Sequence, residues 1–169
     1  YNYIRDVLGR VTYQMNNKAK FAGYYDYIKK YRSNDMQSLY DPETAARVWT
    51  SPNYSTGQIK YTGALTSKFL VEAGWAMNIE RRNTEMQPGI EAERGTPAWF
   101  AGATYAAANT TLGGASNSAF TAGSEWPDRY SYTASASYVT GSHNIKDGFN
   151  GTYGTFYHEV RANADLYQE

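Results

Sequence analysis

The sequence predicts an all-β fold: a segment of an antiparallel transmembrane β-barrel, with about six tilted strands, short periplasmic turns and long extracellular loops. Three observations predict it. Stretches of alternating apolar and polar residues recur along the chain, tight turns join them in pairs, and two long irregular segments separate the pairs. Short connections on one side and long ones on the other are typical of outer-membrane barrels.

The predicted strands can be placed approximately from this pattern. They cover about residues 7–16, 19–32, 57–66, 68–82, 129–140 and 144–158, and the extracellular loops cover about 33–56 and 84–128. Several strands reach or exceed the roughly 9–11 residues that cross a bilayer obliquely. We therefore expect residues 1–169 to belong to one outer-membrane barrel domain.

Each predicted strand has one apolar face, as expected for a period of two residues. In chain order, the six faces are Val7, Gly9, Val11, Tyr13 and Met15; Phe21, Gly23, Tyr25 and Tyr27; Ile59, Tyr61, Gly63 and Leu65; Phe69, Val71, Ala73, Trp75, Met77 and Ile79; Tyr130, Tyr132, Ala134, Ala136 and Tyr138; and Phe149, Tyr153 and Tyr157. Alternation alone does not separate a lipid-facing sheet from one side of a soluble sandwich. The strand lengths and the one-sided long loops favour lipid.

Charged residues in the middle of the predicted strands all fall on the opposite, polar face. These residues are Arg10, Lys20, Asp26, Lys60 and Glu72. A charge facing lipid is costly at the bilayer midplane and nearly free at the interface. We therefore expect these five side chains to face the barrel lumen.

The two long segments are expected to carry the ligand contacts. Asp41 before Pro42 and Glu43 is a helix-start signal, so a short helix or turn is predicted there. The second segment carries aromatic side chains that could contact a ligand. The candidates are Trp99, Phe100, Tyr105 and Trp126.

Composition narrows the function classes. The chain has 16 basic and 16 acidic residues, so it lacks the basic surplus of a nucleic-acid-binding protein. It has 17 Tyr, a residue that suits a boundary between lipid and water, and no Cys. No catalytic residues, metal ligands or cofactor motif emerge, and Glu72 and Glu80 lie too far apart along a strand for paired-carboxylate hydrolysis. We expect neither an enzyme nor a cofactor.

Six strands are too few to close a single-chain barrel, because the smallest known transmembrane barrels have eight. The first residues also lack a signal peptide. We expect the chain to be a portion of a longer barrel, in contact with outer-membrane lipid and with further strands of the same polypeptide. Several copies that share one barrel are the other arrangement considered.

The sequence resembles the barrel of TonB-dependent outer-membrane receptors, in particular the Oar-like group whose chains begin with a carboxypeptidase-regulatory-like domain. The resemblance is carried by residues 60–75, which begin Lys60-Tyr61-Thr62-Gly63, and by segments that follow in order. These segments are residues 88–90, 94–101, 137–146 and 163–168, with residues 20–27 also similar.

That resemblance implies energised uptake of a scarce small ligand by a 22-stranded barrel that is filled by a plug and coupled to TonB. The sequence contains neither a TonB box nor a plug, so no coupling role can be given to a numbered residue. Two alternatives stay open: a passive porin or adhesin-like barrel, and a soluble β-sandwich that binds carbohydrate through its loop aromatics.

Overall fold

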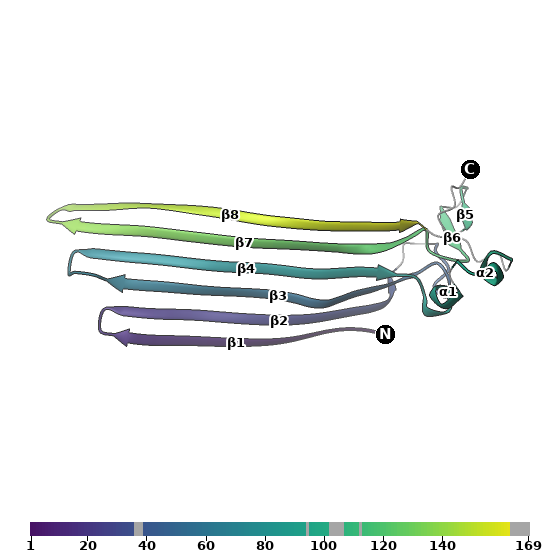
Figure 1. The fold of residues 1–169 in the computed structure, drawn as a ribbon, viewed down its shortest axis with the longest axis horizontal. Helices are drawn as coiled ribbons and strands as arrows, with labels where there is room; N and C mark the ends of the chain where they lie inside the picture. The colour runs from purple at the N-terminus through teal and green to yellow at the C-terminus, as the bar shows by residue number, and fades with distance from the viewer. Residues whose placement is uncertain (36–38, 94, 102–106, 112, 163–169) are drawn as a thin grey trace.

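A six-stranded antiparallel sheet dominates the computed structural model, which describes residues 1–35, 39–93, 95–101, 107–111 and 113–162. Its strands are β1 (Asn2–Asn16), β2 (Ala19–Asp35), β3 (Arg47–Ala64), β4 (Phe69–Glu85), β7 (Thr121–Thr140) and β8 (His143–Ala162). They lie in the order β1-β2-β3-β4-β7-β8, with the hairpin turns at one end (Figure 1). The predicted all-β fold with six antiparallel strands in sequential order is confirmed.

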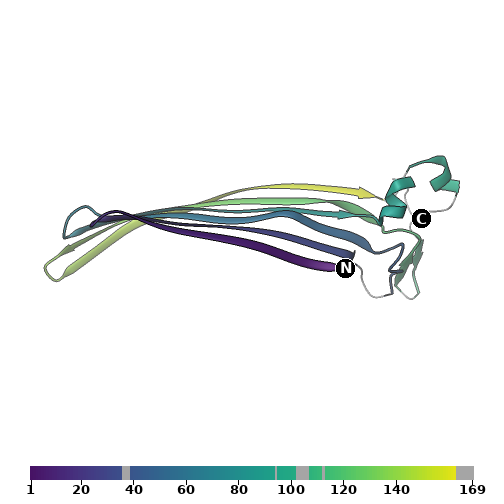
Figure 2. The ribbon, with the colours of Figure 1, turned by 90° about the horizontal axis from the view of Figure 1, so that it is seen from below.

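The sheet is open rather than closed on itself. Among the described residues, β1 and β8 each pair with one neighbour only, so each leaves an unpaired outer edge. Figure 2 shows the sheet edge-on as a single long layer, with nothing stacked on either side of the strands. None of the helices in the described part of the chain is long and apolar enough to cross a membrane.

A small cap lies at the end of the sheet opposite the turns (Figure 1). We define the cap as the described residues of 39–46 and 86–120. It contains α1 (Pro88–Glu93), α2 (Pro97–Ala101), β5 (Ala107–Asn109) and β6 (Gly114–Ser116). Both helices begin with proline, whose fixed φ suits the first helical position, and Thr96 accepts the Trp99 N–H at 3.2 Å.

The segment that starts at Asp41 forms a turn in the cap. The backbone N–H of Glu43 donates to the Asp41 carboxylate at 2.9 Å and the Thr44 hydroxyl donates at 2.8 Å. These hydrogen bonds, the one from Glu43 first, hold the pKa of Asp41 below its usual value. The start signal therefore caps one turn and does not continue into a helix.

All six strands extend further toward the cap than the alternation predicted, including β1, which begins at Asn2, and β4, which runs to Glu85. β2 runs to Asp35, β3 begins at Arg47, β7 begins at Thr121 and β8 runs to Ala162, so the predicted loops at 33–56 and 84–128 were too long. Pro52 and Pro127 made the added parts of β3 and β7 look like loop, because proline cannot donate to a ladder. Pro52 lies where the register shifts between Thr50 and Asn53, and Pro127 lies where the β4–β7 pairing is interrupted.

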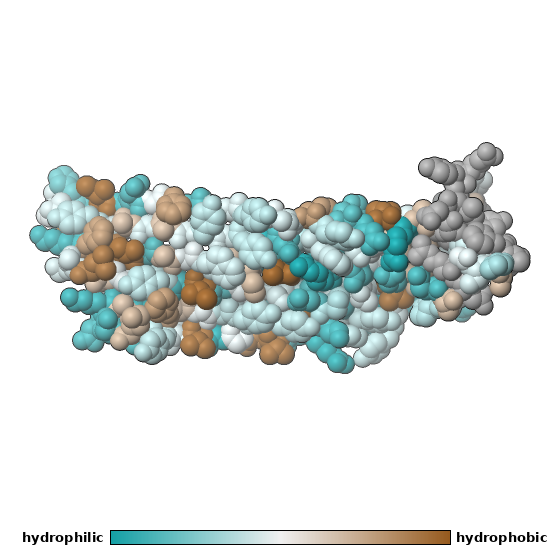
Figure 3. Space-filling view, viewed as in Figure 1, coloured by the Kyte–Doolittle hydropathy of each residue, from teal (hydrophilic) through white to brown (hydrophobic). Residues whose placement is uncertain are grey.

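The six predicted apolar faces coincide on one side of the sheet. Residues directly opposite each other in an antiparallel pair point to the same side. One row across the sheet runs Val11, Gly23, Ile59, Trp75, Tyr132 and Gly151. We call this side the apolar face, and Figure 3 views the sheet from it.

The apolar face has no cover within the described residues. Val7 is 72% exposed, Phe149 is 64% exposed and Trp75 is 43% exposed. The buried apolar side chains lie in or beside the cap: Ala45, Ala46, Met86, Trp99, Ala119 and Ala122. The core of this chain is therefore at the end of the sheet and not along it.

Candidate functional site

The side opposite the apolar face carries the five charges that were predicted to share a face. We call it the charged face. Arg10 lies opposite Tyr24, Lys20 opposite Thr62, Asp26 opposite Thr56, Lys60 opposite Ala22 and Glu72 opposite Thr62. The pairing between strands therefore places all five charged side chains on the same side of the sheet.

Two of these charges meet in a cluster near the turn end of the charged face. Glu72 accepts from Lys60 at 2.7 Å and from Lys146 at 3.2 Å, so three strands contribute to one carboxylate. A shallow cavity of about 500 Å³ lies beside them. Lys146 was not among the predicted charges, because it lies near the end of the predicted strand 144–158 and not in its middle.

A second polar site lies at the cap end of the charged face. A cavity of about 270 Å³ is lined there by residues of β2, β3, β4, β7 and β8. We call this the mouth site and define it by Asp35, Arg47, Trp49, Arg82, Glu125 and His158. A neighbouring cavity of about 400 Å³ shares Asp35 and Arg47 and reaches Tyr40 and Phe120 of the cap.

Ion pairs organise the mouth site. Asp35 contacts Arg32 at 2.5 Å and Arg47 at 3.7 Å. Arg82 pairs with Glu125 on the neighbouring strand. Arg32 also lies over the Trp49 ring, 5.6 Å from its centroid, and that contact fixes the indole beside the cations.

Another pair lies on the same face, closer to the middle of the strands. Lys30 contacts Glu80 at 3.7 Å and lies over the Tyr54 ring at 4.0 Å. The charged face thus carries ion pairs from the mouth site down toward the strand centres. The Lys30 and Glu80 side chains are only partly exposed, at 23% and 22%.

Backbone irregularities place two of the mouth-site residues. Tyr54 of β3 pairs with Ile28 of β2, and Ser51 pairs with Lys30, so β3 has one more residue than β2 between these two pairs. One extra residue at this bulge reverses which side the following side chains face. Trp49 consequently lies opposite Arg32 on the charged face, although its odd number alone would put it with Ile59.

A second shift, between Arg32 and Asp35, acts on β2 in the same way. It brings Asp35 opposite Arg47 on the charged face. The sequence pattern did not reveal the mouth site, because both bulges lie in stretches that carry no alternation signal. Charged residues do occur near the cap end of β4, at Arg81 and Arg82, and Arg82 is one of the mouth-site residues.

Of the four loop aromatics predicted as ligand contacts, Trp99 and Trp126 can be compared, and they lie apart, one in the cap and one in β7. Trp99 is fully buried in the cap, with an exposed fraction of 0%, so it is a core residue and not a surface contact. Phe100 is part of α2. Tyr105 lies outside the described residues.

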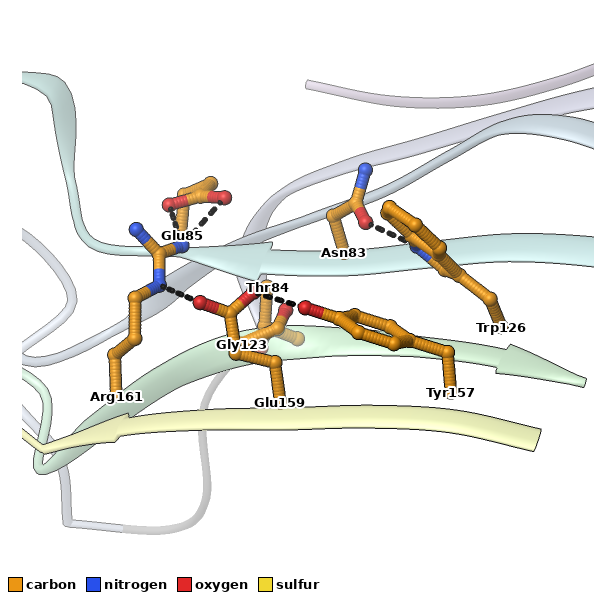
Figure 4. A network of polar contacts seen from close by, with 8 residues as sticks. All are labelled: Asn83, Thr84, Glu85, Gly123, Trp126, Tyr157, Glu159 and Arg161. Carbon is orange, nitrogen blue, oxygen red and sulfur yellow. Dashed lines mark hydrogen bonds and ion pairs between the residues drawn. The ribbon is translucent and has the colours of Figure 1, made fainter.

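Trp126 was predicted in a loop, which was wrong: it belongs to β7 and points to the apolar-face side, opposite Tyr157. Its ring stacks on Tyr157 with 4.6 Å between centroids, and its indole N–H donates to Asn83 at 2.9 Å. Figure 4 shows this contact beside Arg161, which pairs with Glu85 at 2.8 Å and lies 3.7 Å from Glu159. Trp126 therefore belongs to a polar and aromatic belt at the cap end of the apolar face.

The mouth site contains groups that are suited to binding a small polar ligand. Guanidinium groups, carboxylates and an indole ring offer hydrogen bonds, charge and a stacking surface to a small polar ligand. Within the described residues, no group of three or more His, Cys, Asp or Glu side chains could hold a metal ion.

Comparisons with models of known protein families, with curated proteins and with solved structures found no match to this chain.

Proposed function

We propose that the chain forms part of the barrel of an outer-membrane receptor of the TonB-dependent type, which takes up a scarce ligand. The apolar face lies toward lipid and the charged face lies toward the lumen. The hairpin turns are then periplasmic and the cap is extracellular. The mouth site faces the ligand as it enters from outside.

The observation that carries the proposal is the uncovered apolar face. Six strands contribute to it in register, and its large side chains are exposed from one end of the sheet toward the other. Water-soluble monomers rarely expose contiguous apolar patches beyond a few hundred Å². The described residues hold one other sheet, of two strands in the cap, which is too small to form the second layer of a sandwich.

The height of the apolar band also fits a bilayer. On β4 the band runs from Phe69 to Ile79, which at about 3.3 Å per residue is roughly 33 Å along the strand. A strand tilt of about 40° reduces this to a height of roughly 25 Å, the height of the lipid-facing band of outer-membrane barrels. The next apolar-face position on β4 is Arg81, which pairs with Asp128 at 2.5 Å.

The open edges require further strands. In hydrocarbon, each unpaired backbone N–H or C=O costs several kcal/mol. β1 and β8 would leave such groups along their outer edges, so strands beyond this sequence must pair with both. A longer polypeptide supplies them most simply, and strands from further copies of this chain are the other source.

The choice of an energised receptor over a passive porin rests on the resemblance of residues 60–75 and the other segments to TonB-dependent receptors. A receptor of that kind contains a plug, which would meet the charged face from inside. The Lys60–Glu72–Lys146 cluster lies on that face near the turns, where a plug could contact it.

Membrane placement can be tested with the tryptophans. We would compare two variants of the intact protein in bilayers that contain lipids brominated on the acyl chains, with either Trp75 or Trp49 as the only tryptophan of this region. Trp75 lies on the apolar face and Trp49 on the charged face. Strong quenching of Trp75 and weak quenching of Trp49 are expected.

Equal quenching of both residues would contradict the assignment of the two faces. A protein that stays in solution without detergent, with no quenching of Trp75, would favour the soluble carbohydrate-binding alternative instead.

A measurement of ion conductance distinguishes a plugged receptor from a passive porin. In a planar bilayer with potassium chloride, a plugged receptor is expected to give no steady current. A steady open-channel current from the intact protein would favour the passive porin.

A further inference from the structure

Two cations lie directly opposite each other on the side of the sheet that carries the apolar face. Arg5 of β1 pairs with Lys29 of β2 in the register, and both side chains are exposed. The preceding row toward the turns is Val7 opposite Tyr27, which belongs to the apolar band. Arg5 and Lys29 therefore sit just beyond the cap-side limit of that band.

The described residues supply no carboxylate for either cation. The acidic residues of the same two strands near this level, Asp6 and Asp26, lie on the charged face, opposite Ile28 and Leu8. Neither Arg5 nor Lys29 forms an ion pair within the described part of the chain. Like charges placed directly opposite each other destabilise a strand pair, so this arrangement calls for an anion from elsewhere.

The other arginines on the same side of the sheet show a different arrangement. Arg81 pairs with Asp128 at 2.5 Å, and Arg161 pairs with Glu85 at 2.8 Å. On this side of the sheet, the arginines of β4 and β8 have carboxylate partners within the chain, whereas Arg5 of β1 and Lys29 of β2 are open to an external partner.

Tyrosine rings surround the open pair on the cap side. Tyr3 stacks on Tyr31 with 5.5 Å between centroids, and Tyr1 lies 5.8 Å from Tyr3. The Arg5 guanidinium lies over the Tyr3 ring at 4.8 Å. Tyrosine is enriched at the level of lipid headgroups, where one part of the ring is in apolar surroundings and the hydroxyl is in water.

We propose that Arg5 and Lys29 together bind the phosphate of an anionic lipid headgroup at the outer edge of the bilayer. Guanidinium can hold two phosphate oxygens at once, and the lysine ammonium adds a mobile point charge. The acyl chains of the same lipid would lie along the apolar band beside Val7 and Tyr27. The inference rests on the proposed membrane placement and adds a lipid-binding site to it.

The test compares two lipids on the intact protein in a nonionic detergent. Native mass spectrometry during titration with phosphatidylglycerol or phosphatidylcholine gives the ratio of the two affinities. The double variant Arg5→Gln and Lys29→Gln is expected to lower the preference for phosphatidylglycerol on the order of tenfold, because each cation near a headgroup attracts an anionic lipid.

The matched control is the double variant Arg10→Gln and Lys20→Gln. It removes the same charge from the same two strands on the opposite face. Its lipid preference is expected to equal that of the unchanged protein.

Three outcomes would overturn the site. An unchanged ratio in the first variant means that Arg5 and Lys29 do not bind the headgroup. Equal losses in both variants mean that the net charge alone sets the preference. A Trp75 that brominated acyl chains do not quench removes the membrane placement as well, whereas a quenched Trp75 with an unchanged ratio removes the lipid site alone.

Discussion

The cap and the sheet bury their side chains in opposite ways. In the cap, the chain covers its own apolar groups: Trp99 and Met86 are almost completely buried, and the Ser118 hydroxyl donates to the Met86 sulfur at 3.4 Å. Along the sheet, Val7, Ile59 and Phe149 are more than half exposed, although the backbone pairing of the strands is nearly continuous. Hydrogen bonds hold the sheet together, and packing holds the cap together.

The difference shows what each region needs from its surroundings. The cap has its own core, so in the proposed barrel it can keep its shape in water. The sheet leaves one apolar side and both outer edges uncovered by the described residues. In the proposed barrel, lipid covers that side and further strands pair with both edges.

The largest expected effect comes from removing the cap core. Trp99→Ala should destabilise the cap by about 3–5 kcal/mol, because it leaves a large cavity where a fully buried ring was. Hydrogen exchange should speed up in residues 86–101 and stay slow in the middle of β3 and β4. Trp99→Phe, which keeps an aromatic ring, should show a smaller increase. Faster exchange throughout the sheet would mean that cap and sheet unfold as one unit.

A charge on the apolar face tests the sheet side of the comparison. Ile59→Arg should destabilise the protein in a bilayer by about 2–4 kcal/mol if it lies near the midplane. The neighbouring Gln58 is also exposed but belongs to the charged face, opposite Tyr24. Gln58→Arg should therefore have almost no effect on urea unfolding in lipid vesicles. Equal effects of the two changes would argue that lipid does not cover the Ile59 side.

Packing within the sheet is local, and glycine substitutions can show where it occurs. The Tyr132 ring lies over Gly151 on the apolar face, where an added Cβ would collide with it, whereas an added Cβ at Gly9 on the same face meets nothing within 4 Å. Gly151→Ala should cost about 1–3 kcal/mol in the same unfolding assay. Gly9→Ala should be close to neutral. A neutral Gly151→Ala would show that the tyrosine ring moves aside without loss.

The smallest expected effect is a pH dependence confined to the cap. Because its pKa is lowered in the folded state, the Asp41 carboxylate stabilises its turn at pH values above the unfolded value of 3.8. This stabilisation should disappear as the pH falls from there through the lower folded pKa. NMR titration of the Glu43 amide, whose N–H donates to the carboxylate, would follow the change. Asp41→Asn should abolish the pH dependence in this range, and a titration midpoint at or above 3.8 would contradict the assignment.

The alternation of apolar and polar residues was the most informative signal for predicting the fold. The faces assigned to six separate strands met on one side of the sheet, since an antiparallel register preserves alternation wherever no residue is inserted. The strand ends were less accurate because Pro52 and Pro127 resemble loop residues. Neighbouring strands on both sides nevertheless pair with the chain around each proline.

The candidate site was less accessible to prediction than the fold. Aromatic residues in a long segment are a weak signal, because such residues also build a core, as Trp99 does. Trp49 and Asp35 are placed by one-residue bulges, which leave no mark in a short polar stretch. Arg82 and Glu125 are neighbours only after β4 and β7 have paired across a long insertion.

The sequence by itself determined the strands, the hairpin turns and the separation of apolar from charged residues, because these follow from a period of two along the backbone. The tertiary structure alone decided which residues form the mouth site, which side Trp49 faces and which cations keep an internal partner. Those outcomes depend on the register between strands. A single inserted residue is enough to change the side of the sheet that the following side chains face.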